Sequence, residues 1–299
     1  VYLKQLARDF LHRAENMPKP DLIYCSYPSI DFAYASVTFG KKHGIPTVID
    51  IRDLWPDIFV QPFPKVLQPL VRLGFSRETA HAKYAIKNAS KVIAVVPAFI
   101  DWAKEKGRVI RPGDEAVYLG YSAQKHSAES IEEADMYWRD MGLTKDQFIV
   151  CLFGMINVGY GLEMLVEAAK RIQGTDVRFV VCGAGTDLQH LRKISGGVAN
   201  IFFPGYVESS KIHRLMNIAK VGVLTMPMRK DFMDAVPNKS IEYMAGGLVV
   251  LSTLQGHLRH ILEENNAGFY VSDVDSIIAA IERLRNDTAL LEQMRSNAR

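Results

Sequence analysis

The segment Asp234–Gly247 (DAVPNKSIEYMAGG) combines residue types that suit a phosphate and a sugar. Pro237 fits the first turn of a helix, because it has no amide hydrogen to leave unpaired, and Gly246 and Gly247 end that helix. Lys239 then lies in the first turn, where the positive end of the helix dipole disfavours a cation. An anion at the same helix end resolves this conflict, because free amides, dipole and ammonium group converge on it.

Two carboxylates accompany this lysine. Glu242 lies three residues further along, on the same face of the predicted helix. A carboxylate there can accept hydrogen bonds from two hydroxyls, such as those of a ribose. Asp234 lies in the preceding loop, within reach of a sugar. The pattern predicts a phosphate-and-sugar site, and the alternative is an exposed Lys–Glu pair on a surface helix beside a loop aspartate.

Glycines mark the ends of two predicted strands. Gly154 follows one apolar run and leads through Asn157 to Gly159, and Gly183 and Gly185 follow another run. Glycine lets the backbone approach a phosphate or a sugar closely. Neither segment is a full G-x-G-x-x-G fingerprint, and the sequence has no G-x-x-x-x-G-K-[ST] loop. A ligand-binding pair of loops is one interpretation, and two tight strand-to-helix turns are the other.

A further cluster follows a predicted strand in the first third of the chain, in DIRDLWPD. It contains Asp50, Arg52, Asp53 and Trp55. Carboxylates and an arginine at a strand end can bind the hydroxyls or phosphate of an acceptor, or take part in proton transfer. The alternative is an ion pair between Arg52 and an aspartate that pins the loop.

Other chemistries find less support. His257 and His260 are three apart on a predicted helix, but no third ligand is in register, so we expect no metal site. There is no G-x-S-x-G elbow, and no cysteine has an evident base. Cys25, Cys151 and Cys182 lie in apolar runs and are interpreted as small buried side chains in a reducing compartment.

The composition is that of an ordinary globular protein, with 299 residues, 48% hydrophobic and 23% charged. The longest stretches without Lys, Arg, Asp or Glu have 16 residues, and a spanning helix needs ~18–20 apolar residues, so we expect no transmembrane segment. The net charge of +3 is concentrated before residue 126. This basic part favours phosphate-bearing ligands or an anionic membrane surface, or it is a solvated surface. No motif favours nucleic acid.

Apolar runs alternate with helical periods along the chain. Strands are predicted at Asp21–Ser26, Thr47–Asp50, Lys91–Val96, Glu115–Leu119, Phe148–Phe153, Val177–Cys182, Asn200–Phe203, Val221–Thr225, Leu248–Leu251 and Gly268–Val271. Helices are expected between them; Val66–Asn88 is predicted to be mostly helical and Val274–Met294 to be helical. This alternation indicates βαβ units and parallel sheets. We predict an α/β protein of two doubly wound domains, 1–125 and 146–299, separated by the polar stretch Gly120–Asp146.

The sequence resembles a retaining GT-B glycosyltransferase of glycosyltransferase family 4, in the bacterial branch typified by N-acetylfucosaminyl-type transferases of O-antigen and capsule synthesis. The resemblance runs from about Pro20 to the end. It rests on five stretches: DIRDLWPD (Asp50–Asp57), FGMINVGYGLEMLVEAAKRI (Phe153–Ile172), VVCGAG (Val180–Gly185), IFFPGYV (Ile201–Val207) and VPNKSIEYMAGG (Val236–Gly247).

The resemblance implies two Rossmann-like domains facing a cleft and a nucleotide-sugar donor, expected to be UDP-linked, on the second domain. The family's acid pair falls on Asp234 and Glu242, with Asp234 contacting the donor sugar and Glu242 holding the ribose. Lys239 and the backbone of Val236, Pro237 and Asn238 would hold the diphosphate. The remaining donor-side residues are Tyr206 and Val207 at the base, and Gly154, Asn157, Gly159, Gly183 and Gly185 near the phosphates or sugar; Asp50, Arg52, Asp53 and Trp55 are assigned to the acceptor side.

The sequence departs from the family at two points. The first acid is an aspartate, one methylene shorter than glutamate. Met155 and Tyr160 stand about where the family places the basic residues that neutralise the leaving diphosphate. Lys239 and the helix end must then carry more of that charge, or Arg229 and Lys230 contribute.

The resemblance implies transfer to a saccharide or lipid-linked acceptor in surface-polysaccharide synthesis, without metal or cofactor. We expect a cytoplasmic protein with peripheral contact at the inner face of the membrane as an open alternative, because Ile58–Phe75 mixes aromatic, proline and basic residues. An ordinary, partly buried connection is equally compatible with that stretch. A nucleotide-sugar epimerase and a non-catalytic nucleotide-binding fragment also stay open. The first domain shows only about four strands, so we expect further strands before Val1.

Overall fold

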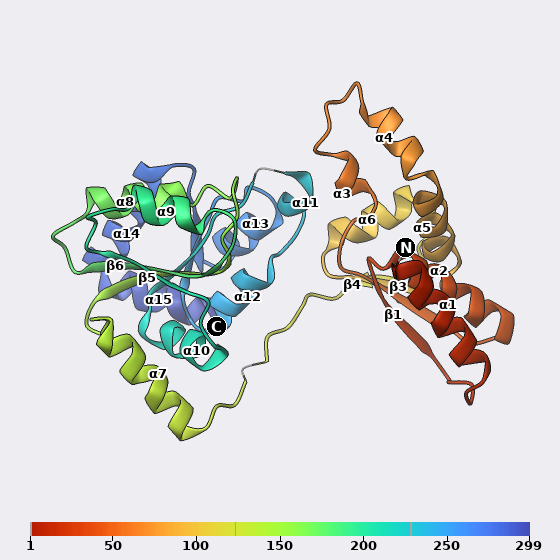
Figure 1. Ribbon diagram of the computed structural model, residues 1–299, viewed down its shortest axis with the longest axis horizontal. Coiled ribbons are helices and arrows are strands. Elements are labelled where there is room, and N and C mark those ends of the chain that lie inside the picture. Colours follow the sequence, from red (N-terminus) through yellow and green to blue (C-terminus); the bar gives the residue numbers. More distant parts are fainter. Residues whose placement is uncertain (1, 123, 228) are drawn as a thin grey trace. The chain divides into compact units, whose positions relative to one another are not determined.

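The computed structural model describes residues 2–122, 124–227 and 229–299, with the side chains of residues 2, 3, 230 and 231 outside the description. It consists of two compact units, Val1–Leu119 and Gly120–Arg299, called unit 1 and unit 2 below (Figure 1). Each unit is built on a parallel sheet with helices on it, as the alternation of apolar runs predicted. No helix among the described residues is both long and apolar enough to cross a membrane.

Unit 1 contains a four-stranded parallel sheet in the order β1-β2-β3-β4. Its strands are β1 (Ile23–Tyr27), β2 (Thr47–Ile51), β3 (Lys91–Ala94) and β4 (Glu115–Ala116), and its helices are α1 (Tyr2–Glu15), α2 (Ile30–His43), α3 (Asp57–Val60), α4 (Gln68–Gly74), α5 (Ser76–Asn88) and α6 (Pro97–Glu105). β2 lies between two strands, and its alternating side chains are mostly buried on both faces, as a central parallel strand requires.

Unit 2 contains a six-stranded parallel sheet in the order β10-β9-β8-β5-β6-β7. Its strands are β5 (Phe148–Met155), β6 (Val177–Ala184), β7 (Ile201–Gly205), β8 (Val221–Leu224), β9 (Val249–Ser252) and β10 (Gly268–Tyr270). The chain begins the sheet in the middle, adds β6 and β7 on one side, and then crosses to β8, β9 and β10 on the other. The strand order therefore reverses between β5 and β8, and in such sheets ligands bind beyond the carboxyl ends of the strands at this point.

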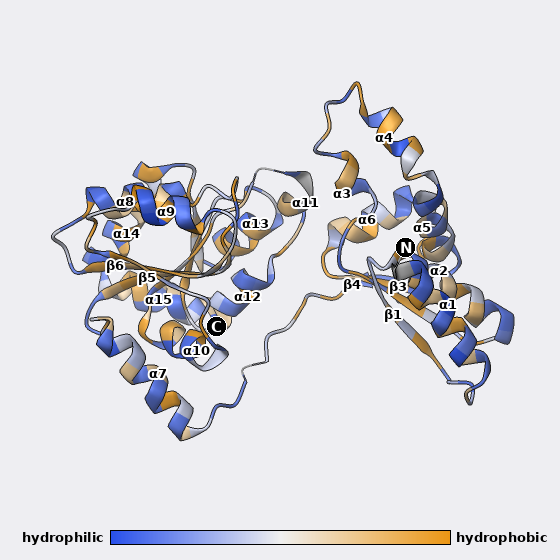
Figure 2. Cartoon of the chain, viewed as in Figure 1, coloured by the Kyte–Doolittle hydropathy of each residue, from blue (hydrophilic) through white to orange (hydrophobic). Residues whose placement is uncertain are grey.

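Apolar side chains cover both faces of this sheet, and the ribbon of its central strands is largely orange, the colour of hydrophobic residues, in Figure 2. One core cluster joins the sheet to α8 (Glu163–Arg171), α9 (Leu188–Ile194), α14 (Val274–Asn286) and α15 (Thr288–Ala298), and the other joins it to α7 (Ala128–Asp140), α10 (Ser209–Ile218), α12 (Asn238–Ala245) and α13 (His257–Glu264). Along β5, successive residues alternate between the two clusters, because side chains of a strand point to opposite faces. The burial explains why the strand sequences are continuous apolar runs.

The three cysteines are buried and unpaired with one another, as expected from their apolar surroundings. Burial raises the pKa of the Cys182 thiol to about 12. The thiolate is the reactive form, so Cys182 is chemically quiet at neutral pH.

The stretch predicted to be mostly helical over Val66–Asn88 contains two helices, α4 and α5, which meet at Phe75. The helices differ from prediction in four other places. The helix predicted over Val274–Met294 is interrupted at Asp287, whose carboxylate accepts a hydrogen bond from the amide of Leu290 (2.9 Å) and so begins α15. The polar stretch 120–146 contains α7, and the short helices α3 and α11 (Lys230–Met233) were not predicted.

Helix α7 is stabilised by a capping residue at its start and by a buried aromatic side chain near its end. The side chain of Ser127 accepts a hydrogen bond from the amide of Ser130, which caps its first turn. Trp138 is buried against α10, and its indole nitrogen donates to the carbonyl oxygen of Lys211 (2.9 Å). The charged residues between these two points lie on the exposed face, which is why the stretch resembles a linker in sequence.

Candidate functional site

The predicted phosphate-binding segment forms the start of α12 in unit 2. The helix begins at Asn238, one residue later than predicted, and Pro237 precedes it as the capping residue. The amide of Ser240 donates to the carbonyl oxygen of Pro237 (2.9 Å), and so does the Ser240 hydroxyl (2.6 Å). Lys239 is thus the second residue of the helix, within the turn where the helix dipole is positive.

Tyr243 fixes this helix over the centre of the sheet. Its buried hydroxyl accepts a hydrogen bond from the amide of Phe153 in β5 and donates to the carbonyl oxygen of Val223 in β8, both at 3.3 Å. A Cβ at Gly222 would lie 2.4 Å from the Tyr243 ring, so the ring occupies the space that a side chain there would need. Because residues four apart share one helix face, Tyr243 also directs Lys239 toward the carboxyl end of β5.

Lys239 reaches the backbone of Gly154 at that strand end. A Cβ at Gly154 would lie 2.3 Å from Cε and 2.4 Å from Nζ of Lys239, and Gly154 has φ +124°. Both the space and the backbone conformation therefore require glycine at this position. The structure brings together Gly154 and Lys239, two residues 85 positions apart that the sequence assigned to one ligand.

The charges of Lys239 and Glu242 only partly compensate for the burial of these two side chains. Burial lowers the pKa of Lys239, and the nearby charge of Glu242 opposes that shift. Burial likewise raises the pKa of Glu242, and Lys239 opposes it. Among the side chains that the structure describes, no carboxylate lies within ion-pair distance of the Lys239 ammonium. A partly buried cation at a helix N-terminus is an arrangement suited to an anionic ligand.

The glycines of β6 have a structural role of their own. A Cβ at Gly183, which has φ +142°, would lie 1.8 Å from the carbonyl oxygen of Gly154, and one at Gly185 would lie 2.0 Å from that of Ile156. These glycines let the ends of β5 and β6 pack tightly. The tight-turn alternative therefore accounts for Gly183 and Gly185 without a ligand.

An apolar cavity of ≈ 400 Å³ lies beside the two strand ends, a volume typical of small-molecule sites. Tyr206, which is 81% exposed, and Val207 border it, so the two residues assigned to a base pocket meet Gly154 and Gly183 there. Its lining residues are Phe153, Gly154, Met155, Cys182, Gly183, Ala184, Tyr206, Val207 and Ile212.

Gly159, Tyr160 and Gly161 are not among the residues that line this cavity. Gly159 and Tyr160 line a different cavity of ≈ 310 Å³, together with residues from the ends of β8, β9 and β10. The Tyr160 ring also meets Phe232 of α11 edge-on, with centroids 6.5 Å apart. The structure thus places Gly159 beside a second cavity rather than beside Gly154.

Asp234 lies in the turn after α11, and its side chain is partly buried. This turn is held by the loop that follows β9, where a Cβ at Gly256 would come 1.8 Å from the carbonyl oxygen of Met233. The Arg229 guanidinium lies over the Phe232 ring, 4.9 Å from its centroid. The side chain of Lys230, the other basic residue considered near the phosphates, lies outside the described residues.

In unit 1, the cluster after β2 is held by its own contacts. Nε of Arg52 lies 2.6 Å from Oδ2 of Asp50, and the Tyr24 hydroxyl donates to the same oxygen at 2.5 Å. Asp53 accepts a hydrogen bond from the amide of Leu54 (2.8 Å), and the Trp55 ring meets Phe59 edge-on at 4.9 Å. The alternative interpretation, an Arg52–aspartate ion pair that pins the loop, describes this arrangement.

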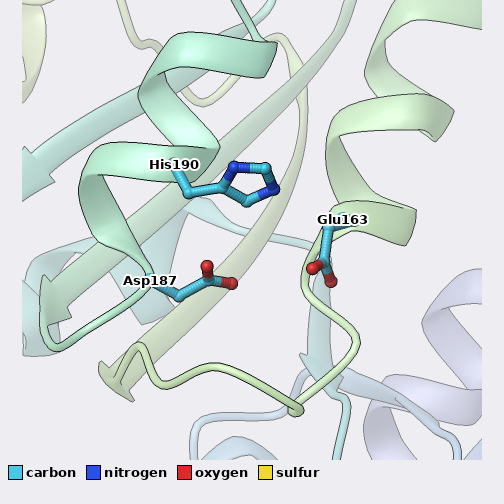
Figure 3. Close-up of side chains that lie close together, drawn as sticks. All are labelled: Glu163, Asp187 and His190. Atoms are coloured by element: carbon cyan, nitrogen blue, oxygen red, sulfur yellow. The ribbon is translucent and has the colours of Figure 1, made fainter.

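One group of side chains escaped the sequence analysis. Glu163, Asp187 and His190 come from two different helix starts, and their ligand-type atoms lie within 4.8 Å of one another (Figure 3). No short motif links residues of two helices, so spacing alone could not have revealed them.

The fold is that of GT-B glycosyltransferases. The structure of Anabaena Alr3699/HepE in complex with UDP matches 98% of this chain and 76% of its own length, with a TM-score of 0.69 and 17% sequence identity. Its complex with UDP-glucose gives the same TM-score at 18% identity, over 98% of this chain and 76% of its own. The parallel sheets of four and six strands agree with this class.

Part of unit 2 is similar in sequence to one known family. Residues 147–287 match the family described as glycosyl transferases group 1. Alpha-galactosylglucosyldiacylglycerol synthase of Streptococcus pneumoniae is 23% identical over 235 residues, which cover 74% of this chain and 59% of the relative. The putative colanic acid biosynthesis glycosyltransferase WcaL of Salmonella typhimurium is 27% identical over 150 residues, 46% of this chain and 36% of the relative. The matches thus span less than two thirds of either relative.

Proposed function

We propose that this protein transfers a sugar from a nucleotide-sugar donor, UDP-linked, to a saccharide or lipid-linked acceptor, with retention of configuration. The observation that carries the proposal is the partly buried Lys239 ammonium at the N-terminus of α12, against Gly154. It lies beside β5, where the strand order reverses, and next to an apolar cavity. The glycosyl transferases group 1 match and the UDP complexes of a protein with the same fold support it.

Each part of unit 2 then has a role toward the donor. The Lys239 side chain and the backbone of Val236–Lys239, in which Pro237 has no amide hydrogen to donate, bind the diphosphate, and the positive charge stabilises it as it departs. Glu242 accepts hydrogen bonds from the ribose hydroxyls, and Asp234 contacts the donor sugar. Tyr206 and Val207 line the base pocket. Their shared task is to hold the donor with its leaving group already stabilised.

Lys239 carries most of the diphosphate's neutralisation in this proposal. Met155 is 60% exposed and uncharged, and Tyr160 packs against Phe232, so neither residue brings a positive charge. Arg229 lies on the same ring of Phe232 and is a candidate for a second cation from the α11 turn.

Unit 1 takes the acceptor in this proposal. The Arg52–Asp50 pair fixes the loop after β2, and Asp53 and Trp55 follow in that loop. The segment from Phe59 to Leu73 exposes large apolar side chains, with Val66 84%, Leu70 70% and Leu73 69% accessible. Together with Lys65 and Arg72 they suit peripheral contact with an anionic membrane surface, where a lipid-linked acceptor would reside.

The experiment is transfer from a panel of UDP- and GDP-sugars to saccharide and lipid-linked acceptors, with Lys239→Ala and Glu242→Ala as variants. Loss of one electrostatic stabiliser of this kind lowers kcat by roughly 10²–10³-fold. Lys170→Ala and Glu167→Ala are matched controls, because these residues form an exposed pair at the same spacing on α8. Unchanged transfer in Lys239→Ala and Glu242→Ala would refute the assignment.

Two product analyses separate the rival functions. Incubation with donor alone gives an epimerised sugar nucleotide if the protein is an epimerase, and leaves the donor sugar unchanged if it needs an acceptor. Calorimetric binding of UDP without UDP release from any mixture of donor and acceptor indicates a binding module.

A further inference from the structure

Unit 2 contains a second polar site, on the α8–α9 side of the sheet. Glu163 is the first residue of α8, Asp187 directly precedes α9, and His190 lies in the first turn of α9. The two carboxylates and the imidazole face one common space from the two helices (Figure 3). Each offers a ligand atom within 4.8 Å of the others.

Asp187 is the unusual member. It is 3% exposed, and its Oδ2 has no hydrogen-bond partner among the described residues. An aspartate before a helix usually accepts hydrogen bonds from the first helix amides, but the Asp187 side chain makes no such bond with α9. A buried carboxylate oxygen without a partner is costly, and the Asp187 carboxylate is turned toward Glu163 and His190 (Figure 3).

The backbone holds Asp187 in this orientation. Its amide donates to the carbonyl oxygen of Ile156, and its own carbonyl accepts from the amide of Leu191, both at 3.0 Å. The aspartate is therefore fixed between the end of β5 and the first turn of α9. Among the described residues, its Oδ2 atom is left without a hydrogen-bond partner, in a site that already holds a second carboxylate.

We propose that Glu163, Asp187 and His190 bind a divalent transition-metal ion, with zinc as the best match. Two carboxylate oxygens and one imidazole nitrogen form a ligand set that zinc accepts, whereas magnesium and calcium prefer oxygen alone. The ion supplies the positive charge that the two carboxylates lack. Water completes the coordination, since the trio provides three protein ligands.

The geometry needs only small adjustments. Ligand atoms around a tetrahedral zinc, each about 2.1 Å from the metal, lie about 3.4 Å apart. The three atoms here lie within 4.8 Å of one another. Glu163 and His190 are exposed and can rotate toward the fixed Asp187.

The ion would tie α8 to α9 and fix the loop between β5 and α8. The hydroxyl of Thr186, next to Asp187, accepts from the amide of Val158 (3.3 Å), and the Thr186 amide donates to the Asn157 side chain (3.4 Å). Metal binding is thus a structural role in this proposal, and it stands apart from sugar transfer. It departs from the expectation of no metal, which rested on His257 and His260 and on the family resemblance.

The test is titration of the chelator-treated full chain with Zn²⁺ alone, followed by calorimetry and thermal unfolding. The wild type is expected to bind one equivalent, and to unfold at a higher temperature with Zn²⁺, since an ion that binds the folded state stabilises it. Asp187→Asn, His190→Gln and Glu163→Gln are each expected to weaken binding at least ~10-fold, because even second-shell changes cost 10–100-fold. Co²⁺ gives an independent readout through its visible absorption, which His190→Gln should alter.

His260→Gln is the matched control, because His260 also lies three residues from a polar partner on a helix but outside the trio. It is expected to leave Zn²⁺ affinity unchanged. If Asp187→Asn does not fold, His190→Gln and Glu163→Gln decide, since both change exposed side chains. The proposal is overturned if the wild type binds no Zn²⁺, if binding persists undiminished in these variants, or if His260→Gln alone abolishes it.

Discussion

The two units differ in how they treat charged side chains near the ends of their strands. In unit 1, Arg52 pairs with Asp50, and the fully buried Arg108 pairs with Asp114 at 2.8 Å. In unit 2, Lys239 is partly buried, and Glu242 is the one described charge that opposes the lowering of its pKa. A charged side chain that already forms an ion pair stabilises the fold. A partly buried charged side chain without an ion-pair partner can instead bind a ligand of opposite charge.

Among the variants, Arg108→Ala should have the largest effect on stability. It tests the contribution of a buried ion pair in unit 1. Loss of the guanidinium leaves the buried Asp114 carboxylate without its ion-pair partner. It also removes the hydrogen bonds to the carbonyl oxygens of Ile86, Ala89 and Ser90. We expect the free energy of unfolding to fall by about 3–5 kcal/mol. Denaturant unfolding measures it.

Lys104→Ala is the control, since it breaks an exposed pair with Asp101 that should be worth about 0–1 kcal/mol.

Burial raises the pKa of Asp114, but its bonds to Arg108 and two backbone amides outweigh burial and lower that pKa. The pair's contribution should therefore be lost as the pH falls through that lowered pKa. Equal effects of the two variants would remove the distinction between buried and exposed pairs.

Gly154→Ala tests the role of the partly buried Lys239 ammonium in unit 2. The added methyl group collides with the end of Lys239 and displaces the ammonium from its position at the strand end. Loss of one charge-assisted contact of about 1.5–3 kcal/mol should weaken UDP binding by roughly 10- to 100-fold in calorimetry. Gly174→Ala is the control, because Gly174 has φ +82° but no atom near its Cβ position. Equal UDP affinity in both variants would show that Lys239 does not depend on Gly154.

A smaller effect is expected from pH. Burial lowers the pKa of Lys239, so the ammonium loses its proton at a lower pH than an ordinary lysine. UDP affinity should fall as the pH rises through this lowered pKa, by about 1 kcal/mol, the difference between charged and neutral hydrogen bonds. Lys239→Arg keeps its charge over the same range and should bind UDP without the alkaline decrease. An identical pH profile in both proteins contradicts the role of Lys239.

Arg52→Ala should give the smallest change. Its side chain is 46% exposed, so we expect a loss of about 0–1 kcal/mol in the free energy of unfolding and an unchanged Kd for UDP. If the loop after β2 contacts the acceptor, the KM for acceptor rises while that for donor does not. A weaker UDP affinity in this variant would contradict the assignment of the donor to unit 2.

The sequence alone predicted the sheets because parallel strands covered on both faces are continuous apolar runs. The strands of both sheets follow those runs. Lys239 was singled out as a candidate because a cation in the first turn of a helix conflicts with the dipole. Both signals depend only on residues close together in the sequence, so they can be recognised without knowledge of the fold.

Contacts between distant segments could not be predicted in the same way. Nothing near Gly154 in the sequence shows that Lys239 fills the space above it, and nothing near Gly222 shows that Tyr243 does the same. The break at Asp287 was missed because helical periodicity continues through that position. Asp187 was missed because its neighbours Glu163 and His190 are brought together only by the packing of α8 and α9.

The central position of β5 also has a consequence for synthesis. As the chain leaves the ribosome, β5, β6 and β7 can pair first, because they are consecutive in both sequence and sheet. The other edge of β5 stays open until β8 is made, and an open edge of an apolar strand is a template for pairing with other chains. Nascent chains that end between Gly205 and Val221 should therefore be the most prone to aggregate, and the most dependent on chaperones.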